Sequence, residues 1–188
     1  SSAASDVYKR QVVRSSLNNH EGTIVREEVN MEKMLVSGVA ADKNATRIAV
    51  IGLKDEPGIA FHLFNALAKY NINVDIILQS VGRNGTKDIS FTVAEDEADE
   101  AVAIIQKSFP KSEYNKIDEE KDVAKISIVG AGMMTHPGVA ASMFEALYDA
   151  GVNIKMISTS EIRVTVLIDE KYTEKALNAV HDKFALGD

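Results

Sequence analysis

The fold is decided by one stretch, Asp55–Ser80 (DEPGIAFHLFNALAKYNINVDIILQS), because a similar stretch returns eighty residues later as Thr135–Ser160 (THPGVAASMFEALYDAGVNIKMISTS). The two stretches align without a gap. The positions they share include a Pro-Gly pair, a phenylalanine, a leucine and an asparagine, at Pro57/Pro137, Gly58/Gly138, Phe64/Phe144, Leu67/Leu147 and Asn73/Asn153. Repetition on this scale indicates two copies of one small module. Ligand sites often form where two such modules meet.

Around the first copy, the hydrophobic pattern predicts a complete set of elements. A buried strand at Arg47–Leu53 precedes a helix that begins near Ile59, with Asp55 as the expected N-cap and Pro57 near the first helical position. The expected elements after it are a strand at 74–81, a hairpin partner at 87–94, a helix at 95–109 and a strand near 114–118. This is the β-α-β-β-α-β order of a ferredoxin-like α+β module.

The second copy repeats this order from Lys125 but stops before its fourth strand. An apolar run near 34–40 has no partner of its own ahead of the first copy. We therefore expect this run to complete the second sheet, with the first module inserted between. The expected domains are 41–122 for the first module and 31–40 plus 123–188 for the second. Residues 1–11 show no periodicity and are expected to be a disordered or non-native tail.

The composition narrows the classes of function. The chain has 188 residues, 45% of them hydrophobic and 26% charged, as in ordinary globular proteins. A net charge of −7 argues against nucleic acid and against an anionic membrane surface. The absence of cysteine excludes disulfides and thiolate metal sites, and the four histidines have no metal-ligand spacing. No signal peptide is visible, so a cytoplasmic location is expected.

The start of the first repeated helix has the chemistry that an amino acid ligand requires. Free N–H groups at a helix N-terminus suit a carboxylate, and they come here from Gly58, Ile59 and Ala60. The Asp55 carboxylate suits an ammonium or hydroxyl group, and the Gln79 amide can both donate and accept. Two plainer interpretations stay open at this point: Asp55 as a helix cap, and Gln79 as an ordinary surface residue.

The two repeated stretches resemble ACT domains, which are small regulatory modules that bind amino acids. Over roughly Val12–Gly187 the chain is similar to the C-terminal regulatory region of aspartokinases, which some members make as a separate small subunit. The segments that carry the resemblance are VRSSLNNHEGT, MLVSGVAADKN, ILQSVGRNGTKDISFTV, KISIVGAGMMTHPGV and ISTSEIRVTVLI.

The resemblance implies a regulatory function. Lysine and/or threonine would bind to the two ACT modules and inhibit the ATP-dependent phosphorylation of L-aspartate. Residues 12–30 would be the last piece of the catalytic kinase domain, and Met31 lies where a separate subunit would start. The catalytic site, with its ATP and magnesium, would lie outside this chain, which is expected to hold no catalytic residue and no cofactor. The implied partners are a second copy, paired through the ACT domains, and a catalytic domain or subunit.

The resemblance also implies which residues hold the effector. In the first pocket these match Asp55, Gly58, Ala60 and Gln79, and the facing module contributes positions that match Asn153 and Ile154. The second copy has Thr135 and Thr159 in place of the aspartate and the glutamine, so an effector there would be held differently. The candidates are Gly138, Val139, Ala140, Ser160 and Glu161, and Glu161 suits a lysine ammonium.

Two alternatives belong to other classes. One is an ACT-type amino acid sensor that acts without a kinase. The other is a small dehydrogenase, suggested by Gly130-Ala131-Gly132 after a strand, but the third glycine of a dinucleotide loop is missing there. The sequence argues against this second alternative.

Overall fold

The computed structural model describes residues 11–13, 23–25, 36–81, 85–131 and 136–186. Contacts between residues divide the chain into two units, Ser1–Met34 and Leu35–Asp188. In the first unit, β1 (Gln11–Val13) pairs antiparallel with β2 (Thr23–Val25). The prediction for residues 1–11 lies almost wholly outside the described residues.

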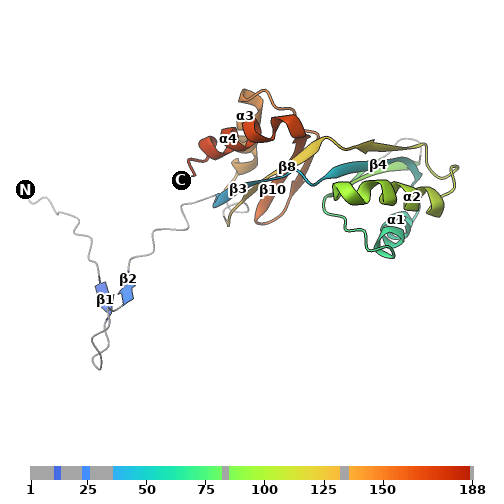
Figure 1. The fold of residues 1–188 in the computed structure, drawn as a ribbon, viewed down its shortest axis with the longest axis horizontal. Helices are drawn as coiled ribbons and strands as arrows, with labels where there is room; N and C mark the ends of the chain where they lie inside the picture. Colours follow the sequence, from blue (N-terminus) through green and yellow to red (C-terminus); the bar gives the residue numbers. More distant parts are fainter. Residues whose placement is uncertain (1–10, 14–22, 26–35, 82–84, 132–135, 187–188) are drawn as a thin grey trace, which may run out of the picture. The chain divides into compact units, whose positions relative to one another are not determined.

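The first module of the second unit contains a four-stranded antiparallel sheet in the order β5-β6-β4-β7. Its elements are β4 (Thr46–Lys54), α1 (Ile59–Ala68), β5 (Ile77–Val81), β6 (Thr86–Val93), α2 (Ala98–Ser108) and β7 (Lys116–Glu120), with a 3-10 turn at Glu95–Glu97. Helices α1 and α2 lie side by side (Figure 1). Ile48, Val50 and Phe91 of the sheet pack with Leu63 and Ile105 of the helices in one core.

The second module has the same architecture, with one strand supplied from ahead of the first module. Its sheet has the order β3-β8-β10-β9. The elements are β3 (Gly38–Asp42), β8 (Val123–Val129), α3 (Val139–Asp149), β9 (Met156–Thr159), β10 (Arg163–Asp169) and α4 (Thr173–Lys183), with a 3-10 turn at Glu170–Tyr172. Strand β3 pairs with β8 as β7 pairs with β4. A strand from ahead of the first module thus completes the second sheet, although it is Gly38–Asp42 rather than 34–40.

The two modules meet at a small apolar cluster, which we call the seam: Ala45, Ile76, Val123, Met156 and Leu167. Ion pairs flank it. Lys125 contacts Asp42 of its own module at 2.8 Å and Asp75 of the other at 2.7 Å. Lys155 contacts Asp169 at 2.9 Å and also pairs with Glu120 across the seam. Burial works against the charged form of Lys125, but hydrogen bonds to Asp42 and Asp75 outweigh it and raise the pKa of the ammonium.

The start of helix α1 differs from the prediction. Its N-cap is Gly58, in the left-handed region at φ 95°, and no side chain caps the helix. Asp55 lies three residues before the cap, so its predicted capping role is wrong. The reason is the Pro-Gly pair, because Gly58 turns the chain sharply into the helix in a conformation that glycine adopts readily. Helix α3 begins in the same way at Gly138, with φ 101°.

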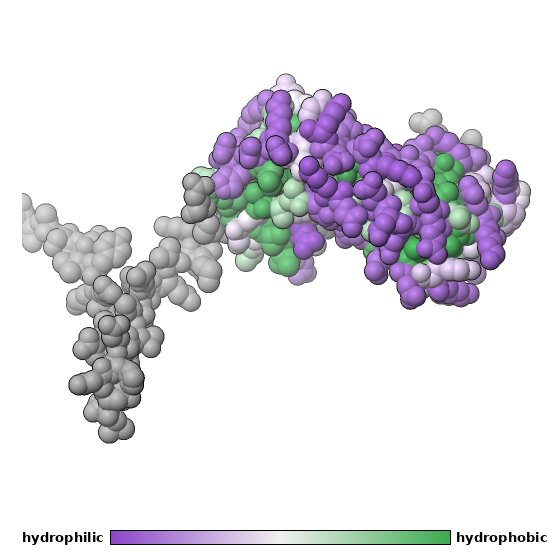
Figure 2. Space-filling view, viewed as in Figure 1, coloured by the Kyte–Doolittle hydropathy of each residue, from purple (hydrophilic) through white to green (hydrophobic). Residues whose placement is uncertain are grey.

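The visible surface of the described residues in Figure 2 is mainly hydrophilic. On the face shown in Figure 2, hydrophobic residues gather over the part that contains β3 and β10. None of the helices among the described residues has the length and apolar character needed to cross a bilayer.

Candidate functional site

A cavity of about 430 Å³ opens at the start of α1 and brings together most of the residues predicted for the first pocket. Its lining consists of Asp55, Glu56, Pro57, Gly58, Ile59, Ala60, Gln79 and Lys87. The volume lies within the range of small-molecule sites. Five predicted residues, from two separate stretches of the chain, therefore surround one space.

The helix terminus gives this cavity its positive character. The first helical hydrogen bond runs from the His62 N–H to the Gly58 carbonyl, at 2.9 Å. The N–H groups of the first turn have no partner within the helix, and no side chain of the described residues caps them. The Ile59 N–H makes a long contact, at 3.4 Å, with the Glu56 carbonyl just before the helix. Together with the helix dipole, they favour a carboxylate. Because Asp55 does not cap the helix, its carboxylate is available to the cavity.

Strand pairing places Gln79 beside the cavity at the start of α1. Gln79 is opposite Ile89 in the β5–β6 ladder, and Ile89 is fully buried in the core beneath the helices. Residues directly opposite each other in a ladder share one face of the sheet. Gln79 therefore lies on the helix side, and β5 is an edge strand, so the side chain stays exposed beside the start of α1.

Lys87 also lines this cavity, although no motif in the sequence pointed to it. Its Nζ lies 2.5 Å from Asp55 Oδ1, and its side chain is 15% exposed against 53% for Asp55. The loop is also tied to the hairpin, because the Asp55 N–H donates to the Gly85 carbonyl at 2.9 Å. In addition, the Gly52 N–H donates a hydrogen bond to Asp88 Oδ1 at 2.8 Å. The Asp55 carboxylate is thus held next to a fixed cation.

The candidates of the second copy are more dispersed. Gly138 is the exposed N-cap of α3, whereas Val139 is 5% exposed and Ala140 packs against the module's core. Ile154 also packs against that core, and Asn153 and Glu161 are exposed. Thr135 lies outside the described residues. None of these six described candidates lines the cavity at the start of α1 or the cavity to which Ser160 contributes.

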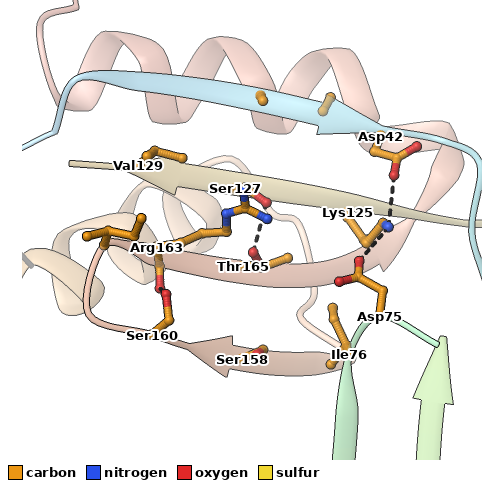
Figure 3. A pocket seen from close by; sticks show the side chains of 13 residues that line it. Asp42, Asp75, Ile76, Lys125, Ser127, Val129, Ser158, Ser160, Arg163 and Thr165 are labelled. Carbon is orange, nitrogen blue, oxygen red and sulfur yellow. Dashed lines mark hydrogen bonds and ion pairs between the residues drawn. The ribbon is translucent and has the colours of Figure 1, made fainter. Parts of the chain in front are cut away.

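Ser160 lies on another surface, the outer face of the second sheet (Figure 3). Ser158 is opposite Thr165, and Thr165 is opposite Ser127, whereas their neighbours Ile126, Val164 and Val166 belong to the core on the helix side. Ser160 follows Ser158 at the alternation of two that puts side chains on one face. It is therefore on the face opposite to α3, away from Gly138, Val139 and Ala140.

The outer face contains a cavity of about 440 Å³ with a polar floor, to which Ser160 and Arg163 contribute. The Ser127 and Thr165 hydroxyl oxygens lie 2.8 Å apart. At the end next to the seam, Lys125 is neutralised by two carboxylates. This cavity shares no residue with the one at the start of α1.

Comparison with known proteins identifies the repeated module. A family model of the ACT domain matches residues 48–109 and 126–184. The crystal structure of the regulatory subunit of aspartate kinase from Thermus thermophilus, in a ligand-free form, is 42% identical with a TM-score of 0.74. That match covers 80% of this chain and 99% of the Thermus chain. The chain belongs to the family of aspartokinase regulatory subunits with tandem ACT domains.

Comparisons with two further proteins agree with this assignment. A crystal structure of aspartokinase alpha and beta subunits is 46% identical, with a TM-score of 0.74, and the match covers 80% of this chain and 99% of that chain. The aspartokinase of Helicobacter pylori is 43% identical over 180 residues, which are 93% of this chain but 44% of the relative. This regulatory chain therefore spans less than half the length of that curated aspartokinase. The predicted α+β fold of two ACT modules is confirmed.

Proposed function

We propose that this chain binds lysine and/or threonine at its ACT modules and that binding inhibits an aspartate kinase. The observation that carries the proposal is the cavity at the start of α1. It combines an uncapped helix N-terminus, the Asp55 carboxylate and the Gln79 amide. A carboxylate receptor and an ammonium receptor within one small space suit a free amino acid. The membership in the aspartokinase regulatory family supports the choice of effectors.

The proposal includes a second copy of the chain. Strands β5 and β9 are edges of their sheets, and each pairs with one other strand among the described residues. Ile77 of β5 is 49% exposed and Ile157 of β9 is 40% exposed. Unpaired backbone groups next to exposed isoleucines favour pairing with another strand. A partner edge beside β5 would enclose the first pocket and provide the positions proposed for Asn153 and Ile154.

The proposed mechanism is linkage between the effector sites and a catalytic domain or subunit. An effector that binds one packing of the modules more tightly favours that packing, and activity falls if the packing disfavours the active kinase. A coupling of about 1–3 kcal/mol, typical of allosteric proteins, changes affinity by roughly 5–150-fold. Aspartate phosphorylation with ATP and magnesium, residues 12–30 as part of the kinase domain, and a cytoplasmic location belong to the same proposal.

Calorimetric titration of the 188-residue chain with threonine, with lysine and with both tests the binding step. We expect Asp55→Ala to weaken binding of at least one amino acid by about tenfold or more, because the ammonium loses its counter-ion. Asp96→Ala is the matched control, since Asp96 is exposed and lies outside the cavity. Unchanged affinities for both amino acids in Asp55→Ala would overturn the assignment of the site.

The regulatory step needs a separate assay, because an ACT-type sensor without a kinase would bind the same ligands. An upstream reading frame that encodes a kinase domain would favour regulation of a kinase over that alternative. The direct test measures aspartate phosphorylation by the complete protein, or by the chain mixed with its catalytic subunit, with and without effector. Full kinase activity at saturating lysine and threonine would exclude inhibition of the kinase and leave the ACT-type sensor as the remaining function.

A further inference from the structure

Lys87 lines the first effector cavity and pairs with Asp55 there. It comes from β6, two residues before the buried Ile89, so alternation turns both side chains towards the helix side of the sheet. The lysine side chain is largely enclosed. The cavity thus contains a built-in ammonium group, the same chemical group that a bound amino acid brings with it.

We propose that Lys87 is a specificity-determining residue of this pocket, which selects amino acids with a neutral side chain over those with a second positive charge. This role rests on the proposed effector binding and names the class of effector for the first pocket. An arriving amino acid replaces the internal Lys87–Asp55 pair with two pairs of its own. The ligand's ammonium pairs with Asp55, and its carboxylate pairs with Lys87 and accepts hydrogen bonds from the N–H groups that begin α1.

This exchange leaves the net charge of the pocket unchanged only when the ligand is a zwitterion of zero net charge. A dibasic amino acid such as lysine brings a second ammonium into a space that already holds Lys87 and the positive end of a helix. Like charges in a partly enclosed site are screened less than charges in open water, so this ligand is disfavoured. Rejection through repulsion is a common source of specificity.

One other charged group lines the cavity, and it does not cancel this effect. Glu56 is exposed, so water screens its carboxylate, whereas the Lys87 side chain is 15% exposed. The Glu56 carbonyl accepts the Ile59 N–H at 3.4 Å, which ties the backbone of Glu56 into the turn before the helix. The enclosed cation therefore dominates the discrimination between neutral and dibasic ligands.

The test is the ratio of the lysine to the threonine dissociation constant, measured by calorimetry on the 188-residue chain. We expect Lys87→Gln, which nearly keeps the length but removes the charge, to lower this ratio by about tenfold. Lys87→Arg keeps the charge and is expected to keep the ratio within about twofold. Lys54→Gln is a second control with the same charge change, because Lys54 is exposed and lies outside this cavity.

An Asp55→Ala background separates this pocket from any site in the second module. There, adding Lys87→Gln is expected to change neither affinity, because the first pocket is already disabled. If the wild-type chain binds threonine but Lys87→Gln leaves the ratio unchanged, the role of Lys87 is refuted and effector binding stands. If the wild-type chain binds neither amino acid, the proposed function and the role of Lys87 both fail.

Discussion

Replacing Gly58 by alanine tests the link between backbone conformation and ligand binding at the start of α1. Gly58 is the N-cap and has φ 95°, a conformation in which side chains are strained. Among the described residues, a Cβ there would meet only His62, at 3.7 Å, so there is space for a methyl group. The cost is therefore the backbone term, about 1–2 kcal/mol for a left-handed residue other than glycine. The reduced freedom of the unfolded chain offsets part of it.

The expected net loss is about 1 kcal/mol of unfolding free energy, measured by urea denaturation as a lower midpoint at unchanged slope. Gly138→Ala is a matched control in the second module. Gly138 has φ 101° and caps α3, and a Cβ added to it would meet no atom of the described residues within 4 Å, so the same loss of stability is expected. Only Gly58→Ala should also weaken effector binding in the first pocket, because only Gly58 lines that cavity.

Two results would refute this reasoning. Unchanged stability in both variants would mean that the left-handed caps carry no strain. An unchanged effector affinity of the first pocket in Gly58→Ala would mean that the conformation of Gly58 does not shape that pocket. Circular dichroism of each variant shows whether the fold persists.

Two further predictions concern the ion pairs and the sheet edges. Partial burial works to raise the pKa of Glu120, but hydrogen bonds from Lys155 and Arg47 outweigh it and hold this pKa below its ordinary value of 4.5. The folded state thus binds fewer protons than the unfolded one, so its stabilisation is present above about pH 4.5 and is lost as the pH falls through the lowered pKa. Urea titrations from about pH 6 to about pH 3 should show this decline, and Glu120→Gln should make it shallower; an unchanged slope would contradict the assignment. At the sheet edge, Ile157→Lys should weaken self-association in sedimentation experiments by placing a charge beside an unpaired strand, whereas Lys171→Gln, away from that edge, should not. Association that persists unchanged in Ile157→Lys would exclude β9 from the contact.

Much of the fold follows from local patterns. The repeat indicates two modules, and the unpaired apolar run near 34–40 indicates that one module is inserted in the other. What the patterns miss depends on distant contacts. Strand β5 begins at Ile77 rather than Val74, because Asp75 and Ile76 both hydrogen-bond to Thr92 and so leave the one-to-one pairing of the ladder. The Ile76 N–H donates to the Thr92 hydroxyl at 3.1 Å, and the Asp75 N–H donates to the Thr92 carbonyl at 3.0 Å.

The candidate site likewise combines features that follow from local sequence patterns with features that depend on distant contacts. The Pro-Gly turn and its repetition locate the first cavity, but the capping role expected for Asp55 is wrong, because that role depends on the φ angle of Gly58. The repeat groups Ser160 with the start of α3, whereas strand alternation carries it to the opposite face. Lys87 could have been found from the sequence, since it continues the alternation of Ile89 and Phe91 towards the helix side. Its pairing with Asp55, however, depends on how the loop is tied to the hairpin.

The ion pairs that flank the seam differ between the two copies of the repeat. Asp75 and Lys155 occupy equivalent positions, eighty residues apart, yet one is an anion and the other a cation. Each reaches into the opposite module, Asp75 to Lys125 and Lys155 to Glu120. A chain built from two identical copies of one module would set like charges against each other in place of one of these pairs. The two modules are thus not interchangeable, because replacing either one by a copy of the other would remove one of these ion pairs.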